Sequence, residues 1–284
     1  MKRNLLLLFT LFVPMFSQAQ LVTMFDEEDT RKGIVVDQVS YEVVYDLTEV
    51  VSKEKDKRQQ FNEPMLLQIG PKCSSFFSYR GFQADSLVKA QFAKGETNVR
   101  IPFSSQVSWK VLAHYPTPDR SVYLDKVANG RYRVEETLDT PEWEIVPDSA
   151  LRLLGYDCRL ATAKYRGRVW SAWYAEDIPL SHGPWKLHGL PGLILKAYDA
   201  GREFVFTASA LRPVSEPKDM VYDGADYELI KRKDLNKIYR SYYADAIGYT
   251  LMSFPAGGRK TLQIHDEQGN VLTHSKPQPY NLIE

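Results

Sequence analysis

The side chains best suited to chemistry in this sequence are two histidines, His182 and His188, in a loop rich in glycine and proline. Imidazole nitrogens are good ligands for zinc, and a turn between two histidines brings them to one ion. A zinc site needs at least three protein ligands, however, and the sequence identifies no third one for this pair. The favoured interpretation is therefore two ordinary loop histidines, and neither a metal nor any other cofactor is predicted.

Known catalytic motifs are missing from the sequence. It contains no G-x-S-x-G nucleophile elbow, no H-E-x-x-H zinc pair, no phosphate-binding loop and no dinucleotide fingerprint. The neighbouring acids Glu135 and Glu136 point to opposite sides if they lie on a strand, so they do not act as a pair. No catalytic residue is predicted.

Two cysteines, Cys73 and Cys158, are the only ones in the chain. An even number of cysteines in an oxidising compartment favours a disulfide bridge between them. The alternative is a pair of separate buried thiols that behave as small apolar side chains.

The first residues predict the compartment. Lys2 and Arg3 precede an apolar run at 5–13, and small residues follow at 17–19. This order is typical of a secretory signal peptide over residues 1–19, cut between Ala19 and Gln20; an uncut membrane anchor is the alternative. No later stretch is apolar enough for a membrane-spanning helix. The mature protein is therefore expected outside the cytoplasm, in the periplasm or at the outer membrane.

Composition restricts the class of partner. The chain of 284 residues has 36 basic and 36 acidic side chains, without a dominant block of either charge. Nucleic-acid sites concentrate Lys and Arg on one face, so a nucleic-acid partner is disfavoured. Aromatic residues make up 12% of the chain, which favours β-sheets and adhesive concave surfaces.

The hydrophobic pattern predicts a mainly β fold. Apolar and polar residues alternate over 39–48, as in a strand with one buried face. Asn129-Gly130 between two β runs is a strong hairpin signal, and one amphipathic helix is expected between Asp226 as cap and Gly248 as stop. Further strands are expected at 65–69, 73–79, 121–128, 131–138, 156–162, 168–174, 204–210, 261–265 and 271–274, with a short helix at 85–93.

Strands that follow one another with few helices predict a curved antiparallel sheet, a half-barrel or barrel-like, with one or two helices. The sequence has no solenoid repeat and no clear boundary, so residues 20–284 are expected to form a single β-rich domain.

One segment is dense in glycine, proline and tryptophan. Residues 168–195 read as a strand, a loop and a second strand, and Leu193-Ile194-Leu195 lacks alternation, so this strand is expected to be covered on both faces. Gly189 to Ile194 spell G-L-P-G-L-I. Together with the preceding G-P-W-K, the W-x-x-W-Y, Asp177-Ile178-Pro179 and the G-Y-x-C at 155–158, this run resembles the exported GLPGLI family of Gram-negative bacteria.

The resemblance implies a secreted, periplasmic protein and no particular reaction, since the family is uncharacterised. Its members tend to be associated with outer-membrane TonB-dependent receptors, which implies an accessory role. The C-terminal residues 280–284 match the expected family ending only loosely. The same strand and turn pattern also resembles LolA-type half-barrels, whose concave sheets hold acyl chains or peptides, although a fold does not determine a function.

Two interpretations of the loop stay open. Its tryptophans fill the core and its glycines and prolines shape a tight corner, which is the favoured view because large aromatic residues are mostly buried. In the other, the loop faces a ligand or partner. Its candidate residues are then Trp170, Trp173, His182, Trp185, His188, Gly189, Leu190, Pro191 and Gly192.

Three functions remain. The first is a non-enzymatic binding or carrier module for an apolar small molecule, lipid or peptide, which predicts a continuous cavity lined by aromatic and aliphatic side chains. The second is an interaction protein that docks an outer-membrane machine, which predicts an exposed apolar patch or a free strand edge. The third, least favoured, is an unfamiliar hydrolase, which predicts a cleft where titratable groups with perturbed pKa converge.

Overall fold

The structure is a computed structural model that describes residues 33–52, 59–95, 103–254, 264–265 and 270–284. The predicted signal peptide lies outside the described residues, as does the turn of the last predicted hairpin. None of the described helices is long and apolar enough to cross a membrane.

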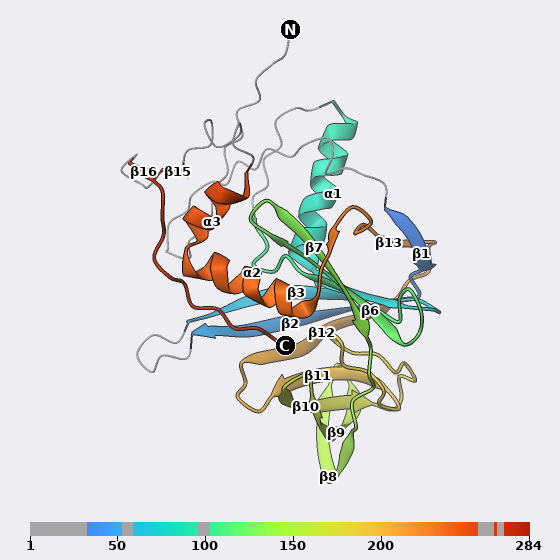
Figure 1. Ribbon diagram of the computed structural model, residues 1–284. Helices are drawn as coiled ribbons and strands as arrows, with labels where there is room; N and C mark the ends of the chain where they lie inside the picture. Colours follow the sequence, from blue (N-terminus) through green and yellow to red (C-terminus); the bar gives the residue numbers. More distant parts are fainter. Residues whose placement is uncertain (1–32, 53–58, 96–102, 255–263, 266–269) are drawn as a thin grey trace.

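The described elements are sixteen strands and three helices (Figure 1). The strands are β1 (Ile34–Gln38), β2 (Tyr41–Ser52), β3 (Gln59–Ile69), β4 (Ser74–Ser78), β5 (Lys110–Ala113), β6 (Arg120–Val127), β7 (Gly130–Thr137), β8 (Glu144–Leu153), β9 (Tyr156–Tyr165), β10 (Arg168–Ala175), β11 (Leu193–Asp199), β12 (Phe204–Pro213), β13 (Asp219–Tyr222), β14 (Glu228–Leu229), β15 (Ile264–His265) and β16 (Val271–Leu272). The helices are α1 (Tyr79–Ala93), α2 (Arg232–Ala244) and α3 (Ala246–Ser253).

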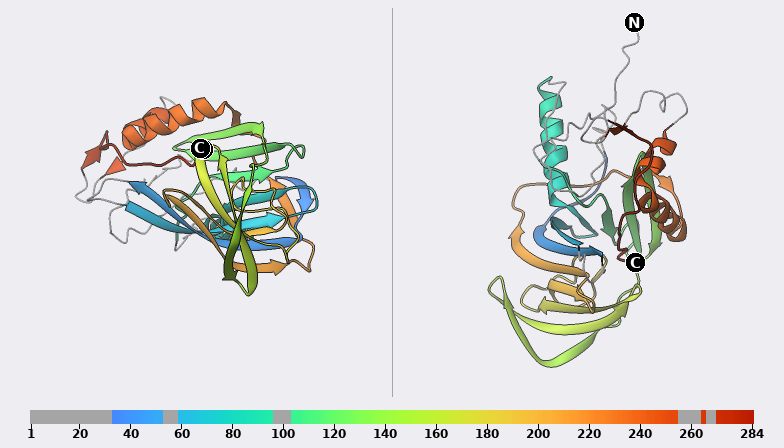
Figure 2. Two further views of the ribbon diagram at one scale, coloured as in Figure 1. Left: turned by 90° about the horizontal axis from the view of Figure 1, so that it is seen from below. Right: turned by 90° about the vertical axis from the view of Figure 1, so that its left-hand side faces the viewer.

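Twelve strands form one sheet in the order β14-β7-β6-β5-β4-β3-β2-β12-β11-β10-β9-β8. Every pair is antiparallel except the short contact of β14 with β7. The sheet curves strongly but does not close, because β14 and β8 lie at opposite ends of the order (Figure 2). The predicted mainly β, curved antiparallel sheet is therefore confirmed as an open sheet, with three helices where one or two were expected.

Alternation along β2 builds the core. Val43, Tyr45 and Leu47 are completely buried, while Asp46 between them is exposed. β2 pairs with β3 on one side and with β12, far away in sequence, on the other. One hydrophobic face thus joins the two halves of the chain.

The turn residues in the sequence located the β6–β7 and β9–β10 hairpins correctly, with a small shift in the exact turn residues of the first. The predicted hairpin is β6–β7, but the residue with positive φ in its turn is Ala128, and Gly130 already pairs with Val127 as the first residue of β7. The β9–β10 hairpin turns at Arg166 and Gly167, as expected from Gly167.

The predicted amphipathic helix is α2, which buries Leu235 and Tyr239. Its predicted boundaries are wrong. Asp226 forms an ion pair with Arg131 rather than a helix cap, and α2 starts after Lys231. Gly248 does not stop α2, because it lies inside α3. There its N–H donates to the carboxylate of Asp245, which caps the start of α3.

Candidate functional site

The segment of residues 168–195 that is dense in glycine, proline and tryptophan folds into β10, a loop and β11, and the two strands pair with each other. Leu193, Ile194 and Leu195 are completely buried, which confirms that this strand is covered on both faces. Gly192 has a specific steric role, because a Cβ there would lie 2.1 Å from the carbonyl oxygen of Ala175. Only glycine allows the loop to approach the end of β10 so closely.

The loop tryptophans differ in exposure. Trp170 and Trp185 are 0% and 1% exposed, with ring centroids 5.6 Å apart, and both belong to the main hydrophobic core. Trp173 on β10 is only partly buried. Of the other candidate residues, Leu190 and Gly192 are buried, whereas Gly189 and Pro191 are exposed.

The two loop histidines do come together, but around a third one that the sequence did not indicate. His114, between β5 and β6, lies edge-on to both, with ring centroids 5.6 Å from His182 and 5.1 Å from His188. Burial, with the neighbouring imidazoles, lowers the pKa of His182 to about 4, and burial also lowers the pKa of His188. The described residues contain no group of three or more His, Cys, Asp or Glu arranged to hold a metal ion.

The predicted Cys73–Cys158 bridge is not present, and this expectation is corrected. Both thiols are free and buried in different places. Cys73 lies in a small cluster with Val39 and Met220, whereas Cys158 on β9 packs in the main core. Burial raises the pKa of both thiols, that of Cys73 to about 12, so neither is a reactive thiolate near neutral pH.

The most unusual polar feature near the motif is a buried ion cluster of Glu136, Arg166, Lys186, Arg232 and Glu284. The side chain of Lys186 is completely buried; its Nζ lies 2.6 Å from Glu284 and 3.1 Å from Glu136. Arg232 of α2 bridges the same two carboxylates at 2.5 and 2.8 Å. Arg166 approaches Glu136 to 2.6 Å. The cluster therefore ties β7, the β9–β10 turn, the loop and α2 to the last residue of the chain.

Arg168, the first residue of β10, holds the chain just before this residue. Its guanidinium donates to the carbonyl oxygen of Leu282 at 2.6 Å and to the Asn281 side chain at 3.0 Å. It also forms ion pairs of 2.8 Å with Asp199 and Glu203. Because a planar guanidinium has five fixed donors, it can fasten two strands and this segment at once.

We call residues 278–284 the C-terminal segment. Besides these anchors, Gln278 donates its backbone N–H to the carbonyl oxygen of Tyr243 on α2. Tyr280 stacks on Tyr243 with ring centroids 4.7 Å apart, and Asn281 donates to the carbonyl oxygen of Val50 on β2. The segment thus runs between α2 and the sheet, fixed at both ends.

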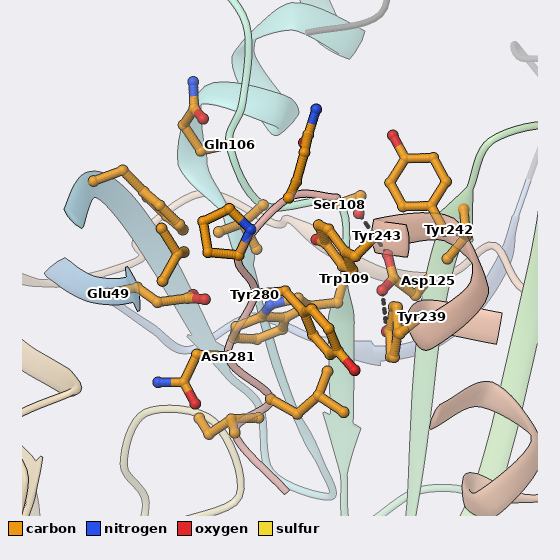
Figure 3. Close-up of a pocket in the computed structure, with 18 of the residues that line it drawn as sticks. Glu49, Gln106, Ser108, Trp109, Asp125, Tyr239, Tyr242, Tyr243, Tyr280 and Asn281 are labelled. Carbon is orange, nitrogen blue, oxygen red and sulfur yellow. Dashed lines mark hydrogen bonds between the residues drawn. The ribbon is translucent and has the colours of Figure 1, made fainter. Parts of the chain in front are cut away.

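A cavity of about 760 Å³ lies between β2, β3, β6, α2 and the C-terminal segment (Figure 3). Its wall combines eight aromatic residues with ten polar or charged ones, and Glu49 and Asp125 are the acids among them. The aromatic residues are Phe61, Trp109, Tyr123, Phe204, Tyr239, Tyr242, Tyr243 and Tyr280. None of the nine loop residues predicted as a contact surface lines it. The loop acts on the cavity through the segment that it anchors.

Glu49 is a buried acid that points into this space without a hydrogen-bond partner among the described residues (Figure 3). It is 8% exposed, and nothing in the described part of the chain donates a hydrogen bond to its carboxyl. Burial raises the pKa of Glu49 to about 8, against an opposing effect of Arg168. Sequence reasoning missed it, although a signal was present: Glu49 continues the alternating face of Val43, Tyr45 and Leu47.

Asp125 is the second buried carboxyl of the cavity, but its oxygens are occupied. It accepts hydrogen bonds from Ser108 at 2.6 Å, from the backbone of Lys126 at 2.7 Å and from the Tyr239 hydroxyl. Burial raises the pKa of Asp125 despite these donors. Its contacts fix α2 onto β6, which is a structural task.

Comparison with known proteins adds a family of unknown function. A family model described as "Protein of unknown function (Porph_ging)" matches residues 143–196, which run from just before β8 into β11. No curated protein matches the sequence.

Among solved structures, "Structure of PNGF-II in P21 space group" matches at a TM-score of 0.45 and 12% identity, over 72% of this chain and 34% of that chain. "Structure of PNGF-II in C2 space group" matches at 0.45 and 14% identity, over 73% and 34%. The chain therefore spans about a third of the length of these structures, and the similarity supports no statement about activity.

Replacing Trp185 by alanine should destabilise the protein by about 3–5 kcal/mol, because the indole is fully enclosed by the core. The matched change Trp173→Ala, at a partly exposed ring, should cost clearly less. Urea denaturation followed by circular dichroism measures both. Unchanged stability of the Trp185 variant would contradict the core assignment.

Acid should weaken the ion cluster through Glu136. Burial alone would raise the pKa of this carboxyl, but Lys186 and Arg232 outweigh burial and hold it at about 2, below the ordinary value of 4.5. A carboxyl with a lowered pKa stabilises the fold above about pH 4.5, and this contribution is lost as the pH falls towards 2. The free energy of unfolding should therefore fall more steeply over this range in the wild type than in Glu136→Gln. Exposed Glu142→Gln is the control and should follow the wild type; equal slopes for all three proteins would refute the assignment.

Proposed function

We propose that this protein is an exported, non-enzymatic binding or carrier module that holds a ligand with a substantial apolar part in the cavity beside the C-terminal segment. The observation that carries the proposal is the cavity itself. Its volume lies within the range of about 300–1,000 Å³ typical of small-molecule sites. Its wall of aromatic side chains interspersed with polar groups offers both apolar contact area and groups that can orient a ligand, as such sites do.

The proposal also places the protein in the exported GLPGLI family. The G-L-P-G-L-I run lies inside the 143–196 match to a family of unknown function, which is consistent with this resemblance. Export to the periplasm or the outer membrane rests on the signal-peptide pattern of residues 1–19. In this proposal the loop residues act indirectly, because Lys186 anchors the segment that forms one wall of the cavity.

Catalysis is less well supported by the same cavity. Two carboxyls with raised pKa face it, as a hydrolase would require. Asp125, however, is saturated by Ser108, Lys126 and Tyr239, and Glu49 has no described hydrogen-bond partner that would position it for proton transfer. A lone carboxyl in an aromatic cavity suits binding better than bond cleavage.

A docking function is the second candidate, because β8 is a sheet edge. This strand of ten residues has β9 as its neighbour and no other strand pairs with it among the described residues. Its Ile145 is 48% exposed. Such an edge can accept a strand of a partner, for example an outer-membrane protein of a TonB-dependent system.

Partly filling the cavity should weaken ligand binding without unfolding the protein. Val51 lines the cavity near the end of β2, so Val51→Trp should weaken the binding of the hydrophobic dye N-phenyl-1-naphthylamine by at least about tenfold. Val35→Trp, at a 51% exposed position on β1, is the matched control and should bind like the wild type. Fluorescence titration measures all three affinities.

Equal affinities for the two tryptophan variants would contradict the cavity as the binding site. A wild-type protein that binds no dye would contradict the carrier proposal and favour docking at β8.

A further inference from the structure

The buried carboxyl of Glu49 is a feature of the cavity that no contact within the folded protein explains. A buried carboxyl without a hydrogen bond destabilises a fold, because the group has lost its water and gained no partner. Other buried acids of this protein are paired: Glu42 with Arg212 and Lys218, and Glu136 with Lys186. Glu49 differs from them by facing open space instead of a cation.

The surroundings of Glu49 favour a cation as its missing partner. Tyr243 and Tyr280 line the same cavity and stack on each other, and the outer face of such a stack attracts cations. The second carboxyl, Asp125, adds negative potential from β6. Arg168, whose charge acts on Glu49, is already engaged in ion pairs with Asp199 and Glu203.

The only basic side chain that lines the cavity within the described residues is Lys126, and it is exposed. An anionic ligand would therefore meet two carboxyls and no buried cation. An apolar ligand without charge would leave the Glu49 carboxyl unpaired, at a cost in free energy.

We propose that the ligand of this cavity carries a cationic amine or ammonium group that pairs with Glu49, while its apolar part lies against the aromatic wall. This inference rests on the proposed function, because it names the chemical class of the ligand held in the same cavity. The ammonium group sits beside Glu49, where β2 and the C-terminal segment line the cavity.

Charged and uncharged probes with one tail test the ligand class. Decyltrimethylammonium, 1-decanol and decanoate are titrated against the dye-loaded full chain at pH 8, below their micelle concentrations. The cation should bind at least about tenfold more tightly than decanol, and decanoate more weakly than both. Equal affinity of the cation and decanol would overturn the inference and leave the carrier proposal standing. Failure of every probe and of the dye would overturn both.

Glu49→Gln isolates the carboxylate. This variant should bind decyltrimethylammonium about tenfold more weakly than the wild type and decanol equally well. Exposed Glu142→Gln should retain both wild-type affinities. Unchanged cation affinity in Glu49→Gln would place the ammonium group elsewhere and overturn the inference.

The pH dependence of cation affinity tests the pairing with Glu49 in the wild-type protein, without a variant. A quaternary ammonium keeps its charge at every pH, so its affinity follows the ionised fraction of Glu49. With a pKa of about 8 this fraction falls about 50-fold from pH 8 to pH 6, and the affinity should fall to about that of Glu49→Gln, roughly tenfold below the value at pH 8. Decanol should show no such change. Arg168 and Tyr243 interact electrostatically with Glu49, and the other titratable groups that line the same cavity are Asp125, Lys126, Tyr123, Tyr239, Tyr242 and Tyr280. A cation affinity that is constant over this range would overturn the pairing with Glu49.

Ionisation of Glu49 should affect fold stability in the opposite direction to cation binding. A carboxyl with a raised pKa lowers the stability of the fold as the pH rises through 4.5 towards 8, because the unfolded chain ionises first. Glu49→Gln should therefore melt at a higher temperature than the wild type at pH 9. A lower melting temperature would mean that the protein itself uses the carboxylate, and it would overturn the inference.

Discussion

The ion cluster around Lys186 is the interaction on which the rest of the structure depends. Burying several charges stabilises a fold only when every charge is paired, and removal of one partner leaves another uncompensated. Lys186 and Glu284 are matched in this way, with Glu136, Arg166 and Arg232 completing the set. Strand β7, the β9–β10 turn, the loop, α2 and the C-terminal segment must therefore all be in place for the cluster to form.

This dependence explains how a loop motif shapes a cavity that it does not line. Gly192 lets the loop approach β10, Trp185 fills the core beneath it, and Lys186 then meets the end of the chain. Arg168 holds the C-terminal segment at Leu282, two residues before Glu284, by donating to the Leu282 carbonyl oxygen. With both anchors set, Tyr280 is held against Tyr243 and closes one side of the cavity.

Glu49 shows the cost of keeping such a cavity. On the same face of β2, Val43, Tyr45 and Leu47 stabilise the core by burial, whereas the next residue in that register is an acid. Proteins commonly retain locally unfavourable groups at functional positions and offset them elsewhere. The aromatic wall and the unpaired carboxyl are together better explained by a ligand than by folding alone.

Local patterns in the sequence predicted local structure well. The alternation in β2, the β6–β7 hairpin and the Leu235–Tyr242 face of α2 depend on neighbours in sequence, so their signals are short-range. The pairing of β2 with β12, the meeting of His114 with the loop histidines and the docking of Glu284 join distant residues, and no local pattern encodes them. The disulfide prediction failed for the same reason, since the cysteine count contains no information on where each thiol lies.

Native mass spectrometry of protein recovered from the periplasm, followed by solvent extraction of bound molecules, tests the central claim most directly. We expect a polypeptide of residues 20–284 with one adduct per chain, and an extracted molecule that has an apolar part and a basic nitrogen. A folded Arg168→Met variant, whose C-terminal segment has lost an anchor, should lose this adduct. A wild-type protein without any adduct, or an adduct retained equally by the variant, would contradict the account of a cavity held in shape by the anchored segment.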